Sequence, residues 1–476
     1  MRASQRGMAY RFCSLVLAVG LSACGGGGGG GSPASGNVTP PTSAFPASST
    51  LANVCTVEGE KKFVRSYLDE KYLWYREIPT VDASRYTTVT DYFKALLVKT
   101  PDANNLPKDQ FSFVISNTDA DSLSTGVNAG YGWDLVYDDA HRIRVTVVAA
   151  GSPAAQAGIA RGGYIASVTS TSVQSFFPNT AGAWMEIRYA DTPDGAQRTI
   201  RLDARTVTDD PVPVTSFVTS PGGKRAGYVL FTAHTQGAQD KLIAAARNLQ
   251  ASGTTELVLD MRYNSGGYLY IASTLAAMVT GSQADGKIFE ALRFNDKRAA
   301  ESADNTYRFA NKVEYAESSL YPVGYTLPRL NLRRIYVLTS ENTCSASESV
   351  INSLRGVDVE VVLVGKSTCG KPYGFTRKTN CALSYYPIEF QGTNNKGFGD
   401  YTAGFAPTCT GSDDLDHALG QTQEKLLASA LYHLDHGSCA PASAQKQAIS
   451  LRSDLAPSLL STERPRLGRL LNPTSH

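Results

Sequence analysis

The chain has 476 residues, of which 42% are hydrophobic and 18% are charged, and its formal net charge is +2. This composition is typical of a globular protein with ample apolar core, and the length allows about three domains. The small net charge gives no basic footprint for nucleic acid, so composition excludes a nucleic-acid-binding function.

Residues 1–24 have the pattern of a targeting segment. Early arginines precede the apolar run from Leu15 to Leu21, which is too short to span a membrane comfortably. The sequence L-S-A-C that ends at Cys24 resembles the lipobox of bacterial lipoproteins, which implies that Cys24 is lipidated; an ordinary secretory peptide is the alternative. Residues 25–50, rich in Gly, Ser and Pro, predict a flexible tether. We therefore expect a lipid-anchored protein of the bacterial cell envelope, on the periplasmic face of the outer membrane.

Six cysteines follow the targeting segment. An even number in an oxidising compartment predicts disulfides, with 15 possible pairings. A bridge from Cys369 to Cys381 across a local hairpin is one candidate. No pair has C-x-x-C spacing, so no metal is expected. The six are Cys55, Cys344, Cys369, Cys381, Cys409 and Cys439.

Residues 51–122 predict a mostly helical region. Phe63, Tyr67 and Tyr72 recur at helical spacing, and a second amphipathic stretch begins at Tyr92. We interpret this aromatic stripe as core.

Residues 123–208 change to strand-like patterns. The sequence G-Y-G-W-D-L precedes an alternating run from Ile143 to Val148, and a glycine-containing run from Gly151 to Val168 follows. This arrangement resembles a PDZ domain. The resemblance implies that the next strand edge pairs with an extended peptide and that a loop binds the terminal carboxylate through its amides. The loop residues are Gly130, Tyr131, Gly132 and Trp133. The alternative is that Gly130 and Gly132 form an ordinary tight turn.

Residues 209–439 predict an α/β core, because strand-like and helix-like segments alternate. The Pro- and Gly-containing stretch from Asp209 to Arg225 predicts a hinge into this core, and a helix within Asp414 to Leu434 is expected to end it. Residues 440–476 are expected to be disordered. The other expected strands and helices are Ala226–Phe231, Gln239–Leu249, Leu257–Leu259 and Ile271–Met278.

Around Ser345 the pattern is strand, tight turn, helix and strand. Apolar residues run from Ile335 to Leu338 and from Val359 to Val364, and helical spacing between them stops near Gly356. Ser345 lies at the turn into the helix, where the first amides have no internal partner and could hold an oxyanion. The alternative is structural, because Ser345 and Glu348 fit the S-x-x-E capping box.

Lys371 follows the second strand in a G-K turn, so its loop and that of Ser345 could open on the same edge of the sheet. Lysine can activate a serine if it is desolvated. Its ordinary pKa of about 10.4 must fall by about 3 units, which an apolar pocket could achieve. Lys366 is the nearest rival, and we expect it to point to solvent or to a surface carboxylate.

Three segments carry a resemblance that covers most of the chain. T-C-S-A-S-E, G-K-S-T-C-G-K and L-V-L-D-M-R-Y-N-S-G-G together resemble the C-terminal processing peptidases, also called tail-specific proteases. The resemblance implies that Ser345 is the nucleophile and Lys371 the base. It also implies an oxyanion hole formed by the amide of Ala346 and by Gly266 or Gly267.

The chain departs from this family in two places. The separation of Ser345 and Lys371 is one residue longer than usual. Phe375 stands where some members have a glutamine that orients the lysine, so the resemblance favours a dyad over a triad. Asp260 and Arg262 are expected to buttress the N-S-G-G turn rather than react.

These patterns predict a multidomain α/β protein with an N-terminal helical region, a PDZ-like β-rich domain and an α/β peptidase core. The predicted function is a serine–lysine endopeptidase that cleaves exported polypeptides recognised by their C-terminal ends, without a cofactor. The alternative is a non-catalytic, PDZ-containing peptide-binding lipoprotein. The joint presence of Ser345, Lys371 and the N-S-G-G turn favours the enzyme.

Overall fold

A computed structural model describes residues 44–138, 140–173, 175–441 and 469–470. The expected targeting segment and most of the expected tether therefore lie outside the described residues. So does most of the tail that was expected to be disordered, although Arg469–Leu470 forms the short strand β21.

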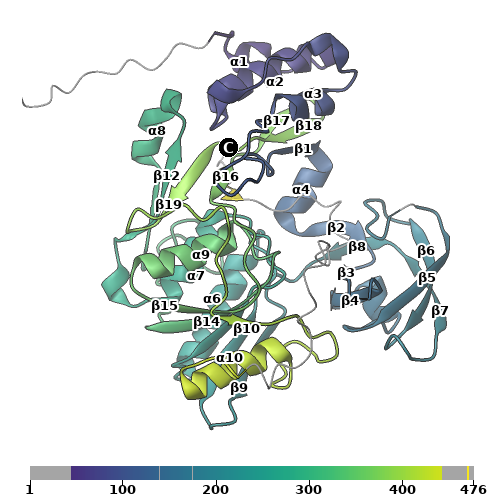
Figure 1. Cartoon of the computed structure of the whole chain (residues 1–476), viewed down its shortest axis with the longest axis vertical. Coiled ribbons are helices and arrows are strands. Elements are labelled where there is room, and N and C mark those ends of the chain that lie inside the picture. Colours follow the sequence, from purple (N-terminus) through teal and green to yellow (C-terminus); the bar gives the residue numbers. More distant parts are fainter. Residues whose placement is uncertain (1–43, 139, 174, 442–468, 471–476) are drawn as a thin grey trace, which may run out of the picture. The chain divides into compact units, whose positions relative to one another are not determined.

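A six-stranded sheet with the order β20-β15-β14-β11-β10-β9 forms the centre of the core (Figure 1). The first five strands are parallel, and β9 is an antiparallel edge strand. The prediction of a hinge from Asp209 to Arg225 is therefore wrong in part. Val214–Thr219, in the middle of this stretch, forms strand β9 and pairs with β10. In sheet order the strands are Cys409–Thr410, Glu360–Gly365, Arg334–Thr339, Leu257–Asp260, Arg225–Leu230 and Val214–Thr219.

Helices cover both faces of this sheet (Figure 1). Ile335 and Val337 of β14 pack in the same apolar cluster as α6, α7 and α9, whereas Tyr336 and Leu338 pack with α10. Burial on both faces explains the unbroken apolar run of this strand. The helices are α6 (Ala238–Ala251), α7 (Leu269–Val279), α9 (Ala346–Gly356) and α10 (Lys425–His436).

The helix expected within Asp414 to Leu434 begins only at Lys425. The preceding residues form a loop that ends at Glu424, whose carboxylate accepts from the amides of Leu426 and Leu427. Glu424 therefore caps α10.

A second sheet, β13-β12-β19-β16-β21, adjoins the core, and the 3-10 helices η3 (Ser282–Ala284) and η4 (Asp296–Arg298) and helix α8 (Ala299–Asp304) flank β12 in the chain. Strand β16 begins two residues after Lys371, so this sheet fixes the direction of the Lys371 loop. In sheet order the strands are Thr306–Arg308, Ile288–Phe294, Phe390–Thr393, Tyr373–Phe375 and Arg469–Leu470.

The N-terminal region is helical, as predicted, but one of its strands belongs to the core. Strand β1 (Phe113–Ser116) pairs antiparallel with β18 (Leu383–Tyr386), which also pairs with β17 (Lys378–Asn380). Phe63, Tyr67 and Tyr72 are buried in the same cluster as the core helices, so the core interpretation of the aromatic stripe is confirmed. The helices are α1 (Ser48–Leu51), α2 (Val57–Lys71), η1 (Tyr75–Glu77), η2 (Ala83–Arg85), α3 (Val89–Leu96) and α4 (Asn117–Thr125).

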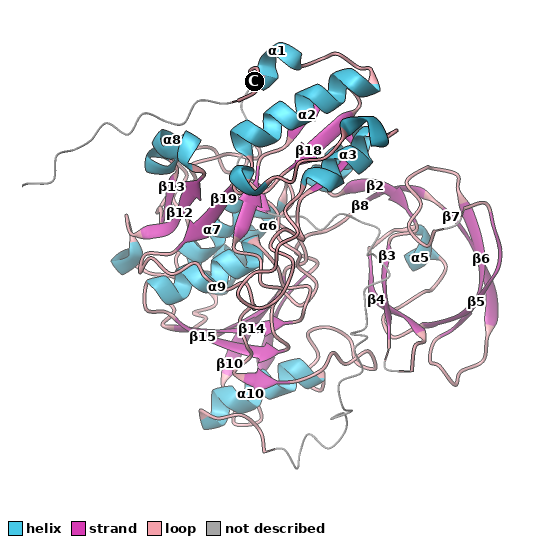
Figure 2. Ribbon diagram, turned by 45° about the horizontal axis from the view of Figure 1, so that its top comes forward, coloured by secondary structure: helices cyan, strands magenta, loops and turns pink. Residues whose placement is uncertain are grey.

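The segment from residue 127 to residue 208 forms a strand-rich domain with its own apolar core (Figure 2). Its five antiparallel strands follow in chain order from β3 to β7, so β3 is an edge strand. A two-stranded ribbon of β2 (Val127–Gly130) and β8 (Arg205–Thr208) closes the domain. Its other elements are β3 (Trp133–Tyr137), β4 (Ile143–Val148), α5 (Pro153–Gln156), β5 (Tyr164–Thr171), β6 (Trp184–Ala190) and β7 (Arg198–Asp203).

All six cysteines of the described region form disulfides, namely Cys55–Cys381, Cys344–Cys369 and Cys409–Cys439. The expected bridge between Cys369 and Cys381 is wrong. Cys369 follows β15 and bonds Cys344, which follows the neighbouring strand β14. Cys381 lies between β17 and β18 and bonds Cys55 of the N-terminal region, whose strand β1 pairs with β18. In the described residues, no helix has both the length and the hydrophobicity needed to cross a membrane.

Candidate active site

Three loops meet at the carboxyl ends of neighbouring parallel strands. The N-S-G-G turn follows β11, Ser345 follows β14 and Lys371 follows β15. The carboxyl edge of a parallel sheet is the usual place for a site in α/β proteins. The structure therefore brings the predicted nucleophile, base and oxyanion residues to one edge.

Ser345 has an unusual backbone conformation. Its φ of 58° and ψ of −111° place a residue with a side chain in a region that favours glycine. The residue is fully buried, and its Oγ has no hydrogen-bond partner among the described residues. Strain of this kind persists only where the surrounding structure imposes it, and it is concentrated at functional sites.

Glu348 joins the loop of Ser345 to the loop of Lys371. Its Oε2 accepts from the amides of Ser345 and Lys371, both at 2.9 Å. Its Oε1 accepts from the Thr368 hydroxyl at 2.6 Å and from the Gly370 amide at 2.8 Å. Burial raises the pKa of Glu348, and these four donors act in the opposite direction. The carboxylate thus joins the backbone at Ser345 to the backbone at Lys371.

The alternative that Ser345 and Glu348 form a capping box is therefore correct only for Glu348. Glu348 does reach back to the amide of Ser345, as in a capping box, but Ser345 Oγ remains unbonded. A hydroxyl that was present only to cap the helix would be bonded to one of its first amides.

The amine of Lys371 lies in an aromatic pocket. Its Nζ is 4.2 Å from the centre of the Phe375 ring and 5.1 Å from that of Phe111, and the residue is only 2% exposed. Phe375 therefore contacts the amine with a ring face where some relatives are expected to have a glutamine. The ring face of Phe375 thus positions the amine at the place where a hydrogen bond to glutamine would.

Lys366 does not compete for this position. Its amine forms a 2.8 Å ion pair with Glu341, and its side chain is 37% exposed. The expectation that Lys366 points to a surface carboxylate is confirmed.

The glycines of the N-S-G-G turn lie against Ser345. A Cβ placed on Gly266 would be 3.0 Å from Ser345 Cβ and from the Ala346 amide nitrogen. The Gly266 amide donates to Asn264 Oδ1. In the described part of the chain, the amides of Ala346 and Gly267 donate to no backbone or side-chain acceptor. This pair of amides is therefore available for an oxyanion, which favours Gly267 over Gly266.

A buried ionic cluster supports the same turn. Arg262 donates to Asp260, Glu424 and Asp413, with contacts between 2.7 and 2.9 Å. The guanidinium lowers the pKa of Asp413 to about 2, against the effect of burial. Asp260 and Arg262 are thus structural supports, as expected. From the strand-rich domain, Arg161 also contacts Asp413, at 2.7 Å.

Sequence reasoning missed His234, which braces the turn from the other side. Its Nδ1 lies 3.0 Å from Asn264 Oδ1, and its backbone bonds to Gly266 and Tyr268. Burial lowers its pKa to about 3, so the ring is neutral at neutral pH. Asn264 belongs to the N-S-G-G motif, whereas no sequence signal marks His234.

The predicted peptide-binding residues lie in the strand-rich domain and are not part of the cluster around Ser345. In the described residues, the amides of Tyr131 and Gly132 donate to no backbone carbonyl, while their own carbonyls accept from Ala154 and Ala149. Gly132 has a φ of 78°, and a Cβ there would lie 2.1 Å from Ser152 Cβ. A side chain at this position would therefore displace the turn.

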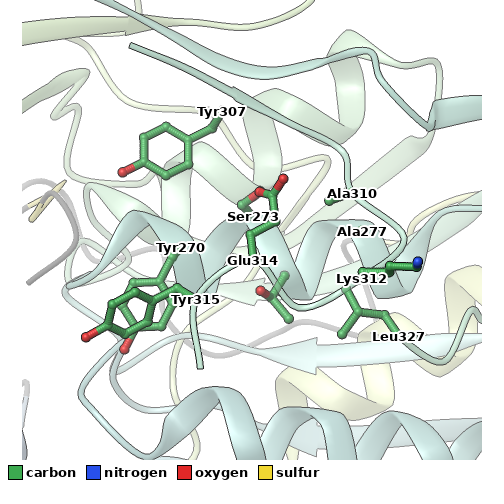
Figure 3. Close-up of a pocket in the computed structure, with 10 residues that line it drawn as sticks. Tyr270, Ser273, Ala277, Tyr307, Ala310, Lys312, Glu314, Tyr315 and Leu327 are labelled. Atoms are coloured by element: carbon green, nitrogen blue, oxygen red, sulfur yellow. The ribbon is translucent and has the colours of Figure 1, made fainter. Parts of the chain in front are cut away.

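Two hollows in the described region lie away from this site. Figure 3 shows a cavity of about 30 Å³ beside α7, lined by Tyr270, Tyr315 and Glu314 among others, with room for about two waters. A second hollow of about 420 Å³ includes Glu256 and Arg334 and lies at the amino ends of the parallel strands. Neither contains Ser345 or Lys371.

Comparisons with known proteins agree with this geometry. Residues 225–379 match the model of Peptidase family S41, and residues 59–113 match that of the Peptidase S41 N-terminal domain. No curated protein matches the sequence.

Among solved structures, a protein of Bacteroides fragilis NCTC 9343 described as an S41 protease has a TM-score of 0.61 at 26% identity, covering 78% of this chain and 96% of that one. The photosystem II D1 C-terminal processing protease has a TM-score of 0.46 at 20% identity, with coverages of 75% and 94%. Mature CPAF complexed with lactacystin has a TM-score of 0.44 at 13% identity, with coverages of 79% and 96%.

Proposed function

This chain belongs to peptidase family S41, whose peptidase and N-terminal domains it carries, and we propose that it cleaves polypeptides with Ser345 as nucleophile and Lys371 as general base. The proposal rests on one observation, which is that the Glu348 carboxylate bonds to the backbone of both residues. One of its oxygens accepts from the amides of both residues at 2.9 Å. A carboxylate that joins these two loops has a clear purpose only if their side chains act together.

The reaction would follow the usual course of acyl transfer. Ser345 Oγ attacks the substrate carbonyl and passes its proton to Lys371 Nζ, and the leaving amine then takes this proton. The amides of Ala346 and Gly267 would stabilise the oxyanion, since donors aimed at the developing charge contribute strongly in a water-excluded site. A water molecule, activated by the same lysine, would then hydrolyse the acyl-enzyme.

We further propose that the strand-rich domain acts as a PDZ domain that recognises substrate C-termini. The free amides of Tyr131 and Gly132 suit a terminal carboxylate, and the edge strand β3 follows them directly. An extended peptide can add to such an edge through main-chain hydrogen bonds. Arg161 links this domain to Asp413 and hence to Arg262, which gives a path of contacts to the oxyanion turn.

Digestion of casein by the purified protein tests the peptidase assignment. We expect cleavage by the wild type and none by Ser345→Ala, which keeps the fold because Oγ makes no described hydrogen bond. A folded wild type without activity, or an active Ser345→Ala variant, would contradict it. A mass-spectrometric search for peptides trapped by Ser345→Ala would then identify substrates.

A further inference from the structure

One disulfide directly joins the two catalytic loops. Cys344 immediately precedes the nucleophile, and Cys369 lies two residues before the base. The loops are also linked by the Cys369 amide, which donates to the Thr343 carbonyl at 3.1 Å. In the described region, this disulfide is the only covalent cross-link between the two loops. Each of its cysteines lies within two residues of a proposed catalytic residue.

The disulfide also lies against the carboxylate that aligns the dyad. Cys369 Sγ is 3.4 Å from Glu348 Oε2, the oxygen that accepts from the amides of Ser345 and Lys371. A disulfide sulfur has no hydrogen to donate, so the oxidised pair leaves this oxygen to the two amides. A free thiol at Cys369 would present a competing donor.

The backbone strain at Ser345 gives the disulfide a further role. A residue with a side chain holds a φ of 58° only while its neighbours leave it no alternative. Cys344 is one of those neighbours, and its side chain is fully buried and fixed by the bond to Cys369. Without this bond, the residue before the nucleophile could relax.

We propose that Cys344 and Cys369 are positioning residues of the dyad, and that the peptidase is fully active only while they are disulfide-bonded. This inference rests on the proposed function of Ser345 and Lys371. Cys369 is partly exposed whereas Cys344 is buried, so a reductant reaches the bond from the Cys369 side.

The switching step is a thiol–disulfide exchange with a dithiol. A thiolate of the dithiol attacks Cys369 Sγ and releases the thiolate of Cys344. The second thiol of the reagent then displaces Cys369, so that two electrons and two protons pass to the protein and the dithiol becomes a disulfide. An oxidised dithiol reverses the reaction.

The chain contains a matched control for general stabilisation. Cys409–Cys439 closes a loop of 30 residues, close to the 25 of Cys344–Cys369. Loop closure should therefore stabilise the fold to a similar extent in both. Only the bond between Cys344 and Cys369 lies beside the dyad.

The experiment compares the wild type with Cys344→Ala/Cys369→Ala and with the control Cys409→Ala/Cys439→Ala. Each protein is measured oxidised, reduced with dithiothreitol and reoxidised, by casein cleavage and by the rate at which a fluorophosphonate labels Ser345. EDTA is present throughout, because the ligand atoms of Cys344, Glu348 and Cys369 lie within 4.8 Å of one another and freed thiols could capture zinc. Mass tagging reports which thiols are free, and thermal unfolding reports the fold.

We expect reduction to lower kcat and the labelling rate of the wild type at least about tenfold, with KM within about twofold and full recovery on reoxidation. The Cys344→Ala/Cys369→Ala variant should have the low rate under all conditions, and the control should behave as the wild type. Full activity of wild type with both thiols verified as free would overturn the inference, even if the alanine variant fails to fold. Labelling needs no substrate, so absence of casein cleavage in the oxidised wild type would contradict the proposed function alone.

Discussion

At the scale of single residues, the site depends on buried polar groups whose charges are fixed by their partners. Burial raises the pKa of Glu348, while its four described donors favour the ionised form. His234 is the opposite, a neutral ring held by Asn264. Both groups support residues that are proposed to react, and neither is expected to exchange protons with substrate.

His234 makes the free energy of unfolding decrease as the pH falls. Its pKa of about 3 in the folded chain lies far below that of an unfolded histidine, so protons bind preferentially to the unfolded chain as the pH falls. We expect this residue to remove about 1.5 kcal/mol of unfolding free energy between about pH 6.5 and about pH 5. Urea unfolding of His234→Gln over this range should show a correspondingly flatter dependence. Parallel curves for variant and wild type would contradict the assignment.

The sequence predicted that Ser345, Lys371 and the glycines meet at one edge of the sheet, because each follows a recognisable strand within a short motif. It could not identify the full role of Glu348, whose other partners lie twenty or more positions away. Nor could it pair the cysteines, since spacing alone does not reveal which loops meet.

At the scale of elements, glycines hold the N-S-G-G turn, which is the proposed oxyanion turn, in place. Gly267 has a φ of 139°, and a Cβ there would lie 2.3 Å from the His234 carbonyl oxygen. We expect Gly267→Ala to lower kcat about a hundredfold with little change in KM, because one oxyanion donor is displaced. Steady-state kinetics on a peptide substrate would measure this.

Gly253→Ala is the matched control for this change. Gly253 also has a positive φ, of 69°, but a Cβ there would meet nothing within 4 Å. The control should lose some stability and keep its kcat. Equal losses of kcat in both variants would show that backbone strain, not the oxyanion turn, is responsible.

The alternation of strands and helices in the core was predictable, because buried parallel strands such as β14 form continuous apolar runs. Strand β9 was not predicted. Val214–Thr219 is a half-exposed edge strand between Pro- and Gly-containing turns, and such a segment has the composition of a hinge.

At the scale of the whole molecule, the strand-rich domain is proposed to select substrates by their C-termini. A valine at position 132 would collide with Ser152 and displace the Tyr131 and Gly132 amides. We expect the wild type to cleave free-carboxylate peptides about tenfold faster than amidated ones, and Gly132→Val to lose this preference. Competition between the two peptide forms in one reaction measures it. Equal wild-type rates on both forms would contradict the proposal.

Cys24 is proposed to carry the lipid that anchors the protein to the cell envelope. Membrane and soluble fractions of cells that express Cys24→Ala should show release of the protein, because the acyl chains would be absent. Retention of the variant in the membrane fraction would argue for another means of attachment.

The order of the domains followed from the sequence, but their connections did not. Pairing of β1 with β18 and the Cys55–Cys381 bond join segments separated by most of the chain. Long-range pairing of this kind depends on tertiary packing, which no local pattern records.

Lys371 is proposed to be the base for Ser345, and a pair of lysine variants tests this role. A free lysine is neutral at pH 7 in only about one molecule in 2,500, so a surface lysine would be a poor base. Lys371 is buried against Phe375, whereas Lys366 is paired with Glu341 at the surface. Lys371→Ala should lower kcat at least about a thousandfold, and Lys366→Ala should remain within about tenfold of wild type. Near-normal turnover by a folded Lys371→Ala protein would contradict the account.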